Sequence, residues 1–302
     1  MITDVDLKNC IKKFAESVHD ILDGKLQSVY LFGSVVLQDS KDGWSDIDLI
    51  CFTSEKLSSD EADRLLTLRQ ALVTSEASPI YRKFEGAVVC IDEFLSNRFS
   101  KLVYWGTSGQ KISNAYSLDV FSMFELMKYG KLIFGTDIRI QLVLPSYSDL
   151  VAGVKQHYDT IRKYAQTTNE SIYSCGWLLD ISRCLFTLKY GEIISKTEAG
   201  EWALEEDICP CISDMKKTLQ IRHNPSDYLD LPETKRWLCS LGISVQKYAD
   251  ILEKELNDKS NFLPRKYDVW SFFYIPKSTL FTKAKCFFCN YLNKSGFAEM
   301  LL

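Results

Sequence analysis

The residues Leu31–Ser34 read Leu-Phe-Gly-Ser, and ten residues later Ser45–Leu49 reads Ser-Asp-Ile-Asp-Leu. The short β-branched and aromatic run Ser28–Phe32 predicts a strand that ends at the glycine and serine. The run Asp46–Phe52 predicts a second strand soon afterwards. These two strands and the turn between them decide our interpretation of the fold.

The second strand places two carboxylates together. Residues two apart on a strand point to the same face, so Asp46 and Asp48 present both side chains on one face. Ile47 and Leu49 point to the other face and anchor the strand in a core. Two adjacent carboxylates repel each other unless a cation lies between them. Because hard oxygen ligands suit Mg²⁺, which takes its remaining ligands from water and substrate phosphates, the pair predicts a magnesium site.

The Gly-Ser turn predicts a phosphate contact. Gly33 has no side chain, which would let a phosphate approach the backbone, and Ser34 would expose N–H groups if it opened a helix. A third carboxylate is needed to complete the metal site or to take a proton from an attacking hydroxyl. Glu85 is the candidate, because a charge just before the apolar run Ala87–Ile91 is unexpected without a role. The alternative is a solvent-facing edge residue.

The surrounding pattern predicts a small α/β domain. Apolar side chains recur at helical spacing from residue 4 to 23. Ser58 and Glu61 form a capping box for a helix that follows the second strand. Lys83–Ile91 predicts a third strand. The expected order is therefore helix, strand, turn, strand, helix, strand, in a domain that we place at residues 1–145.

The rest of the chain predicts an α-helical bundle at residues 146–302, which makes the fold class α+β. Ser195 and Glu198 form a second capping box. Residues 262–302 are an unassigned C-terminal extension with aromatic and basic side chains. Helical periodicity marks five segments: Tyr147–Gln166, Ile172–Tyr190, Lys196–Glu206, Ile212–Arg222 and Glu233–Asn257.

These motifs resemble a known family. Gly-Ser followed by Ser-Asp-Ile-Asp-Leu resembles the signature of the DNA polymerase β-like nucleotidyltransferase superfamily. The residues Ser182–Lys196 (SRCLFTLKYGEIISK), followed by Glu201–Ala203 (EWA), resemble the helical domain of aminoglycoside adenylyltransferases of the (3″)(9) type. Together the resemblance spans residues 28 to 222.

The resemblance implies roles for individual residues. It makes Asp46 and Asp48 magnesium ligands and Glu85 the catalytic base, next to the metal. It implies that Ser34 and Ser45 contact the phosphates of ATP, beside Gly33. It also implies that Arg183 and Lys196 reach the triphosphate from the helical domain, where a guanidinium fork and an ammonium suit phosphate.

The chain departs from the family where the acceptor binds. The family's substrate-binding tryptophan and aspartate have no clear counterparts, since Trp177 and Asp180 lie too close to Arg183. A nucleotide-contacting tyrosine is replaced around Ile221–Arg222. The remaining candidates for contact with the acceptor substrate are Trp105, Glu170 and Tyr173.

The resulting hypothesis is a magnesium-dependent transfer of AMP from ATP to a hydroxyl of a small cationic antibiotic. An aminoglycoside or aminocyclitol is the expected acceptor, and a lincosamide is an alternative. A second alternative is a protein or RNA acceptor, as in toxin-like members of the superfamily. A third is a binding protein that retains the fold without catalysis, which the intact carboxylates disfavour.

The composition of the chain argues against some classes of binding partner. The net charge of −4 speaks against nucleic acid, and apolar runs are too short to cross a membrane. The N-terminus has no signal-peptide pattern, so we expect a cytoplasmic protein. We also expect the protein to be a monomer. Its ten cysteines are expected to be reduced. Zinc bound by Cys209, Cys211, Cys286 and Cys289 is a weak alternative. Of the three histidines, only His223 lies near the predicted site.

Overall fold

The computed structural model describes residues 4–75, 78–106 and 109–260. Residues 1–259 form one compact unit, so the boundary predicted near residue 145 stays a prediction. Cys286 and Cys289, like the rest of the extension from residue 262, lie outside the described residues. Within the described part of the chain, no helix has the length and apolar character that crossing a membrane requires.

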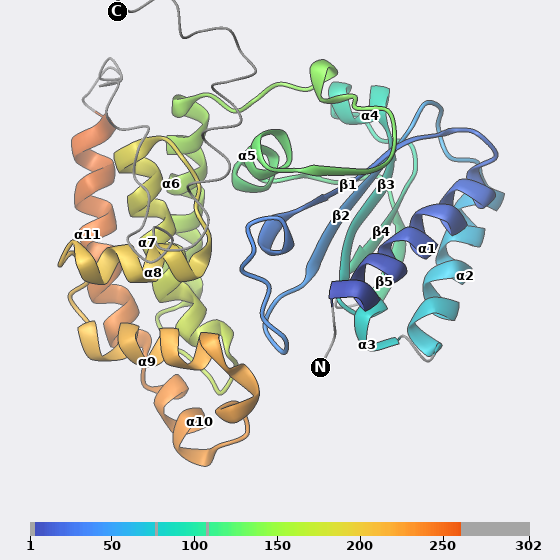
Figure 1. The fold of residues 1–302 in the computed structure, drawn as a ribbon. Coiled ribbons are helices and arrows are strands. Elements are labelled where there is room, and N and C mark those ends of the chain that lie inside the picture. The colour runs from blue at the N-terminus through green and yellow to red at the C-terminus, as the bar shows by residue number, and fades with distance from the viewer. Residues whose placement is uncertain (1–3, 76–77, 107–108, 261–302) are drawn as a thin grey trace, which may run out of the picture. The chain divides into compact units, whose positions relative to one another are not determined.

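The α/β part (residues 4–142) is built on a six-stranded mixed sheet in the order β5-β4-β3-β2-β1-β6 (Figure 1). The pair β2 and β3 is parallel, and each other neighbouring pair is antiparallel. The strands are β1 Leu26–Phe32, β2 Ile47–Thr53, β3 Phe84–Cys90, β4 Leu102–Gly106, β5 Gly109–Ser113 and β6 Lys131–Gly135. The three strands predicted from sequence are present.

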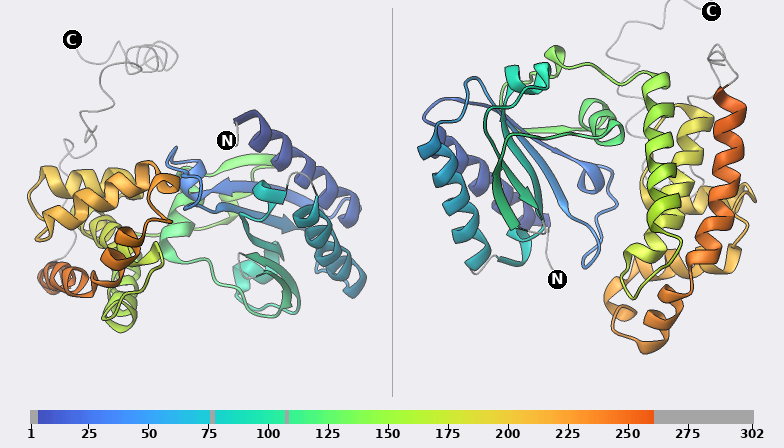
Figure 2. Two further views of the ribbon diagram at one scale, coloured as in Figure 1. Left: turned by 90° about the horizontal axis from the view of Figure 1, so that it is seen from below. Right: turned by 180° about the vertical axis from the view of Figure 1, so that it is seen from behind.

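Helices cover both faces of this sheet (Figures 1 and 2). Helices α1 (Asp4–Leu22) and α2 (Ser59–Thr74) pack on one face, over alternate apolar residues of β1 and β2. Helices α4 (Ile91–Ser96) and α5 (Val120–Lys128) cover the other face. The short helix α3 is Ser78–Tyr81. The period-two alternation of the strands thus separates two cores.

Local signals in the sequence fix several helix ends. The Ser58–Glu61 capping box forms as predicted and satisfies backbone N–H groups at the start of α2. A second capping box, Ser195–Glu198, starts α8. At the end of α1, Gly24 has φ +85°, a conformation that glycine adopts without strain. These confirmed signals are local, which is why sequence reasoning found them.

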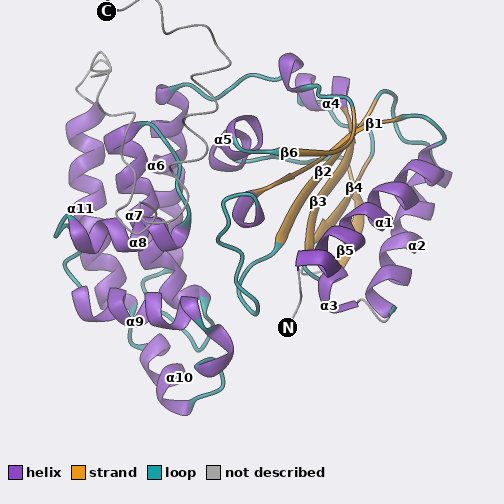
Figure 3. Ribbon diagram, viewed as in Figure 1, coloured by secondary structure: helices purple, strands orange, loops and turns teal. Residues whose placement is uncertain are grey.

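The helical part (residues 147–260) contains helices and loops, as Figure 3 shows. Its α-helices are α6 Tyr147–Tyr164, α7 Tyr173–Tyr190, α8 Lys196–Glu205, α9 Ile212–His223, α10 Pro232–Cys239 and α11 Gly242–Ser260. The α+β class is therefore confirmed. The prediction of a single helix over residues 233–257 is wrong. Helix α10 ends at Cys239, and α11 begins at Gly242, which lies against the backbone of Gln166.

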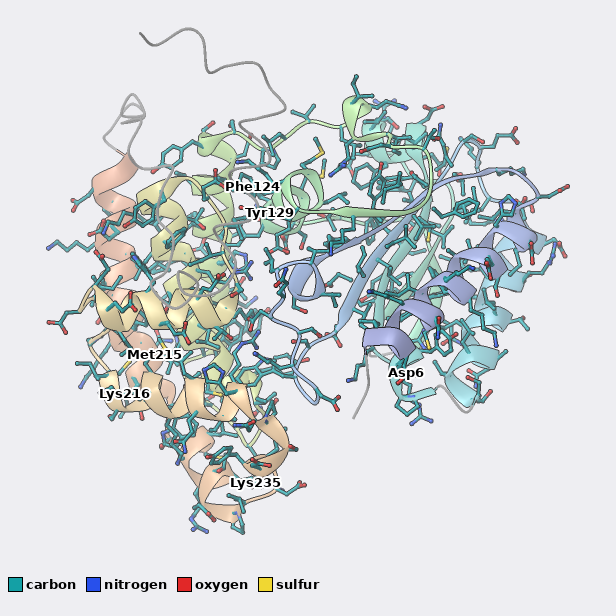
Figure 4. The ribbon with its side chains drawn as sticks, in the orientation of Figure 1. Asp6, Phe124, Tyr129, Met215, Lys216 and Lys235 are labelled. Carbon is teal, nitrogen blue, oxygen red and sulfur yellow. The ribbon has the colours of Figure 1, made fainter. Side chains whose placement is uncertain are left out.

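Side chains at the end of α5 contact the helical part, and side chains on α9 pack within it (Figure 4). The rings of Phe124 and Tyr129 pack edge to face, with centroids 6.3 Å apart. The hydroxyl of Tyr129 donates to Glu192 of the helical part at 3.2 Å. On α9, Met215 is fully buried whereas Lys216 is exposed. The end of α5 and the core face of α9 therefore both contribute to the packing that supports the site.

Candidate functional site

A cleft of about 540 Å³ lies between the α/β part and the helical part. Side chains of both parts line it, and charged and aromatic types dominate. The main lining residues are Gly33, Ser34, Asp39, Trp44, Ser45, Asp46, Asp48, Asp119, Phe121, Glu125, His157, Tyr173, Trp177, Asp180, Arg183, Lys196 and Arg222. The predicted carboxylate pair and the predicted phosphate-binding cations thus meet in one space.

The carboxylates come from adjacent strands. Asp46 directly precedes β2, and Asp48 is its second residue. In the parallel β2–β3 ladder, Asp48 lies beside Glu85. All three residues alternate onto the sheet face that α5 covers, because they are in phase with Ile50 and Ala87 of that core. The register therefore brings together the three carboxylates that the sequence singled out.

This arrangement concentrates negative charge. Burial, followed by repulsion from Glu85, raises the pKa of Asp46 to about 6. Burial, followed by the charges of Glu125, Asp46 and Glu85, raises the pKa of Asp48 to about 7. Each carboxylate is thus held in surroundings that disfavour its ionised form. A bound cation would relieve that repulsion.

The donor set fits Mg²⁺ held by two carboxylates. Among the described residues, no group of three or more His, Cys, Asp or Glu side chains converges closely enough to hold a metal. Mg²⁺ does not need such a cage, because it keeps several waters and takes phosphate oxygens from its substrate. Asp46 and Asp48, with their raised pKa values, fit that role. Glu85 lies beside Asp48 in the β2–β3 ladder, and its role as a third ligand stays a prediction.

Glu85 instead has a tyrosine partner. The hydroxyl of Tyr104, on β4, donates a hydrogen bond of 2.6 Å to Glu85 Oε1. Burial, and then this hydrogen bond, raises the pKa of Tyr104 to about 12. The tyrosine therefore stays protonated and holds one oxygen of the carboxylate in place. Glu85 is not among the cleft-lining residues and lies beside Asp48 in the β2–β3 ladder.

The turn after β1 is shaped by Asp48. Gly33 begins a 3-10 turn at φ +69°, and the carboxylate of Asp48 fills the space beside its Cα. The missing side chain makes room for Asp48, and because Gly33 also lines the cleft, its contact with phosphate stays a prediction. Ser34 Oγ lies 3.4 Å from the backbone oxygen of Asp46, and Ser45 Oγ accepts from the backbone N–H of Lys41 at 2.9 Å. Both serines line the cleft, as predicted for phosphate contacts.

The two predicted phosphate-binding cations already have carboxylate partners. Arg183 of α7 pairs with Glu125 of α5, and both side chains are almost fully buried. Arg183 Nε also donates to the backbone oxygen of Ile194 at 3.1 Å. Lys196, at the start of α8, pairs with Asp180 at 2.8 Å. The charges of Lys196 and Arg183 outweigh burial and keep the pKa of Asp180 low.

A third charged pair is buried deeper. Arg222 of α9 and Asp39, from the segment between β1 and β2, lie 2.6 Å apart and are 2% and 4% exposed. Thr197 donates to both carboxylate oxygens of Asp39, through its hydroxyl at 2.5 Å and its backbone N–H at 3.2 Å. Arg222 Nε donates to the Thr197 hydroxyl at 3.0 Å. Its guanidinium also stacks over Trp44, 5.0 Å from the ring centroid.

The candidate acceptor contacts fall in different places. The prediction that Trp105 contacts the acceptor is wrong. Trp105 is 4% exposed and packs against Phe14 in the core under α1. Its partner in the β3–β4 ladder is Gly86, which faces the opposite side of the sheet from Glu85. Glu170 is exposed and outside the cleft. Tyr173 lines the cleft.

Trp177 and Asp180 also line the cleft, although their spacing from Arg183 had argued against them. Trp177, Asp180 and Arg183 follow one another at intervals of about one turn on α7, so the three side chains share a helix face. His157, expected to be a surface or packing residue, lines the cleft and packs on Phe121 with ring centroids 4.7 Å apart.

Sequence reasoning missed Asp39, Tyr104 and Glu125. None belongs to a motif, and each acquires its partner from a distant segment. The weak signal for Glu125 was a charge within an apolar helix, of the same kind that drew attention to Glu85. Cys209 and Cys211 lie with their sulfurs 3.6 Å apart. His223 lies 3.6 Å from Glu201 and outside the cleft.

Comparison with known proteins agrees with this geometry. Residues 11–87 match the family of nucleotidyltransferase domains, and residues 145–210 match the C-terminal domain of aminoglycoside adenylyltransferases. No curated protein matches the chain with significant similarity.

One solved structure shares the fold over most of its length. The spectinomycin adenyltransferase AAD(9) from Enterococcus faecialis, solved with ATP and spectinomycin, is 18% identical to this chain. The match covers 81% of this chain and 98% of that one, with a TM-score of 0.59. A tri-AMPylated HEPN toxin of Shewanella oneidensis with its MNT antitoxin is 18% identical over 52% of this chain and 88% of that one. Its TM-score of 0.24 is too low to carry an argument.

Proposed function

We propose that this chain transfers AMP from ATP to a hydroxyl of a small cationic antibiotic, an aminoglycoside or aminocyclitol. Its matches to nucleotidyltransferase domains over residues 11–87 and to the C-terminal domain of aminoglycoside adenylyltransferases over residues 145–210 support the proposal. One observation carries the proposal. Asp46 and Asp48 share a cleft with Arg183 and Lys196, which come from a different part of the chain. A metal-binding pair facing two cations is the arrangement that a metal–triphosphate complex requires.

Asp46 and Asp48 would hold Mg²⁺. The ion, when bound, neutralises phosphate charge and makes the α-phosphorus more susceptible to attack. The repulsion that raises the pKa of both aspartates disappears when they share a cation. The chain therefore contributes a pair of ligands already poised for a divalent ion.

The transfer forms one bond and breaks one. The oxygen of the acceptor hydroxyl attacks the α-phosphorus, the bond to the β-phosphate breaks, and pyrophosphate leaves. Glu85 takes the hydroxyl proton, as a general base. Tyr104 holds one oxygen of Glu85, and the other oxygen would receive that proton. Glu85 lies beside Asp48, so a metal-bound nucleotide would bring the reacting atoms close to it.

Arg183 and Lys196 would bind the β- and γ-phosphates and stabilise the charge of the leaving pyrophosphate. Ser34 and Ser45 add hydroxyl groups on the opposite wall of the cleft. The proposed acceptor site lies at the α5–α7 end. There Asp119 is an exposed carboxylate, and Tyr173 and Trp177 offer aromatic faces to a cationic ring system.

Pyrophosphate release tests the proposal. The purified protein is incubated with ATP, Mg²⁺ and one member of a panel of aminoglycosides, aminocyclitols and lincosamides. Asp48→Asn is the inactive control, and Glu170→Gln is the matched control, because Glu170 is an exposed acid outside the cleft. We expect release with one acceptor class that Asp48→Asn abolishes and Glu170→Gln retains. Release with no small acceptor would contradict the proposed acceptor and redirect the search to protein or RNA.

A further inference from the structure

The cations proposed to bind phosphate are not free in this cleft. Arg183 is paired with Glu125, and Lys196 with Asp180. The two pairs differ in origin. Asp180 and Lys196 both belong to the helical part, whereas Glu125 lies on α5 of the α/β part and reaches across the cleft to Arg183.

Glu125 occupies a donor of Arg183 that would otherwise be open to a phosphate. Its carboxylate accepts from Arg183 Nη2, which lines the cleft. A guanidinium binds carboxylate and phosphate through the same donors and in the same plane. Nε of Arg183 is directed to the backbone oxygen of Ile194. A phosphate that uses the same N–H of Nη2 as Glu125 must therefore displace this carboxylate.

Glu125 is also held in an unfavourable place for an anion. It is 6% exposed, and its charge is the largest electrostatic influence on Asp48 after burial. Asp48 and Asp46 lie in the same cleft. Arg183 is the cation that offsets this crowding, and without it Glu125 would be a buried charge with no counter-ion. The pair therefore satisfies both partners in the nucleotide-free protein.

We propose that Glu125 is an internal competitor of the nucleotide: it occupies Arg183 in the free protein and must yield this arginine to the phosphates of ATP. This inference rests on the proposed function, because it assumes that Arg183 binds phosphate. Removing the charge of Glu125 should therefore strengthen the binding of ATP, although Glu125 lines the active-site cleft. In the unmodified protein, a ligand must carry enough phosphate charge to displace Glu125 from Arg183.

The test measures binding of ATP by calorimetry in EDTA, so that metal binding at Asp46 and Asp48 does not contribute. Glu125→Gln keeps the shape and a hydrogen-bond acceptor for Arg183 but removes the charge. We expect it to bind ATP about tenfold more tightly than the unmodified protein, within the usual range of coupling between two sites. Adenosine, which has no phosphate, should bind both proteins equally. Thermal melting confirms that each variant is folded.

Glu170→Gln is the matched control. It removes one negative charge and keeps the shape of the side chain, at a residue that is exposed to solvent and lies outside the cleft. Because water screens an exposed charge, its effect on ATP binding should be at most about twofold. In an Arg183→Gln background, the gain from Glu125→Gln should disappear.

The outcomes separate this inference from the proposed function. If the unmodified protein binds ATP and a folded Glu125→Gln binds it no better, or no better than Glu170→Gln, the competitor role is wrong and the proposed function stands. An equal gain for adenosine overturns it as well. If only Glu125→Gln binds ATP or inorganic tripolyphosphate, the competitor role is supported in its strongest form. If neither protein binds either ligand, both the proposed function and this inference fail.

Discussion

The carboxylate of Asp48 fills the space that a side chain at Gly33 would need. A Cβ on Gly33 would lie 2.0 Å from Asp48 Oδ2 and 2.8 Å from Asp48 Cγ, distances that real atoms do not adopt. Gly33 also has φ +69°, which disfavours any L side chain. The turn after β1 and the metal-binding strand β2 therefore depend on each other.

Gly33→Ala should move Asp48 out of position. We expect pyrophosphate release to fall by at least about 100-fold, since a misplacement of about 1 Å in a catalytic group has that effect. Steady-state kinetics with the active acceptor measure the loss. The matched control is Gly24→Ala, because Gly24 also has positive φ, +85°, but no atom within 4 Å of the added Cβ. Equal activity losses in the two variants would show that backbone strain alone is responsible.

Tyr104→Phe should release the oxygen of Glu85 that the tyrosine holds. The hydrogen bond is 2.6 Å long and joins a hydroxyl to a carboxylate, the stronger class of hydrogen bond. We expect kcat to fall about tenfold with little change in the KM for ATP, because only the orientation of the base changes. Tyr116→Phe serves as the control, since Tyr116 lies near the same carboxylates. A larger effect on KM than on kcat would contradict a positioning role.

The stability of the metal-free protein should fall as pH rises from about 4 to about 7. The pKa of Asp46 is raised to about 6 and that of Asp48 to about 7, so the folded state binds more protons than the unfolded state in this window. The free energy of unfolding therefore decreases with pH. Thermal melting in EDTA and in Mg²⁺ measures this. Mg²⁺ should raise the melting temperature more at pH 7.5 than at pH 5, and Asp48→Asn should flatten the EDTA profile. A profile that rises with pH would be inconsistent with the raised pKa values.

Arg222→Gln should lower the free energy of unfolding by about 3 kcal/mol, because it removes the buried counter-ion of Asp39 and leaves only Lys41, at 3.6 Å and partly exposed. Denaturant unfolding measures the change. Adding Asp39→Asn should recover part of the loss. Arg162→Gln is the control, because its partners Asp250 and Glu253 are exposed and surface pairs contribute at most about 1 kcal/mol. Similar losses at both arginines would mean that burial does not decide the effect.

Substitutions of two tryptophans should have different effects, one on acceptor binding and the other on stability. Trp177 lines the cleft, and Trp177→Ala should raise the KM for the acceptor several-fold while the melting temperature changes little. Trp105 is in the core, and Trp105→Ala should cost about 3–5 kcal/mol of stability. Kinetics and thermal melting on both variants provide the comparison. A rise in acceptor KM for Trp105→Ala at temperatures where it is folded would return that residue to the site.

The predictable features were those encoded within a few residues. The capping boxes at Ser58 and Ser195 depend on contacts three residues apart, and the alternation of Asp46 and Asp48 depends only on the pleat of a strand. The elements between residues 91 and 145 were not assigned, because α4 and β4–β6 are only five or six residues long. Such short segments give little periodicity to read.

What could not be predicted depends on pairs that are distant in sequence. Arg183 was identified, but nothing near it in the chain indicates that Glu125 is its partner. The same holds for Tyr104, which meets Glu85 only through the register of the sheet. Trp105 was misplaced for a related reason: one step along β4 reverses the face to which a side chain points.

The buried bond between Asp39 and Arg222 has a consequence for how the chain is assembled. Either half expressed by itself would lose the buried partner of its charge: Arg222 would lose Asp39, and Asp39 would keep only the partly exposed Lys41. The β1–β2 segment also docks on Thr197, so the two halves complete each other's polar interior. We therefore expect hydrogen exchange to show the sheet and α9 opening together, as a single cooperative folding unit rather than as two that fold in turn.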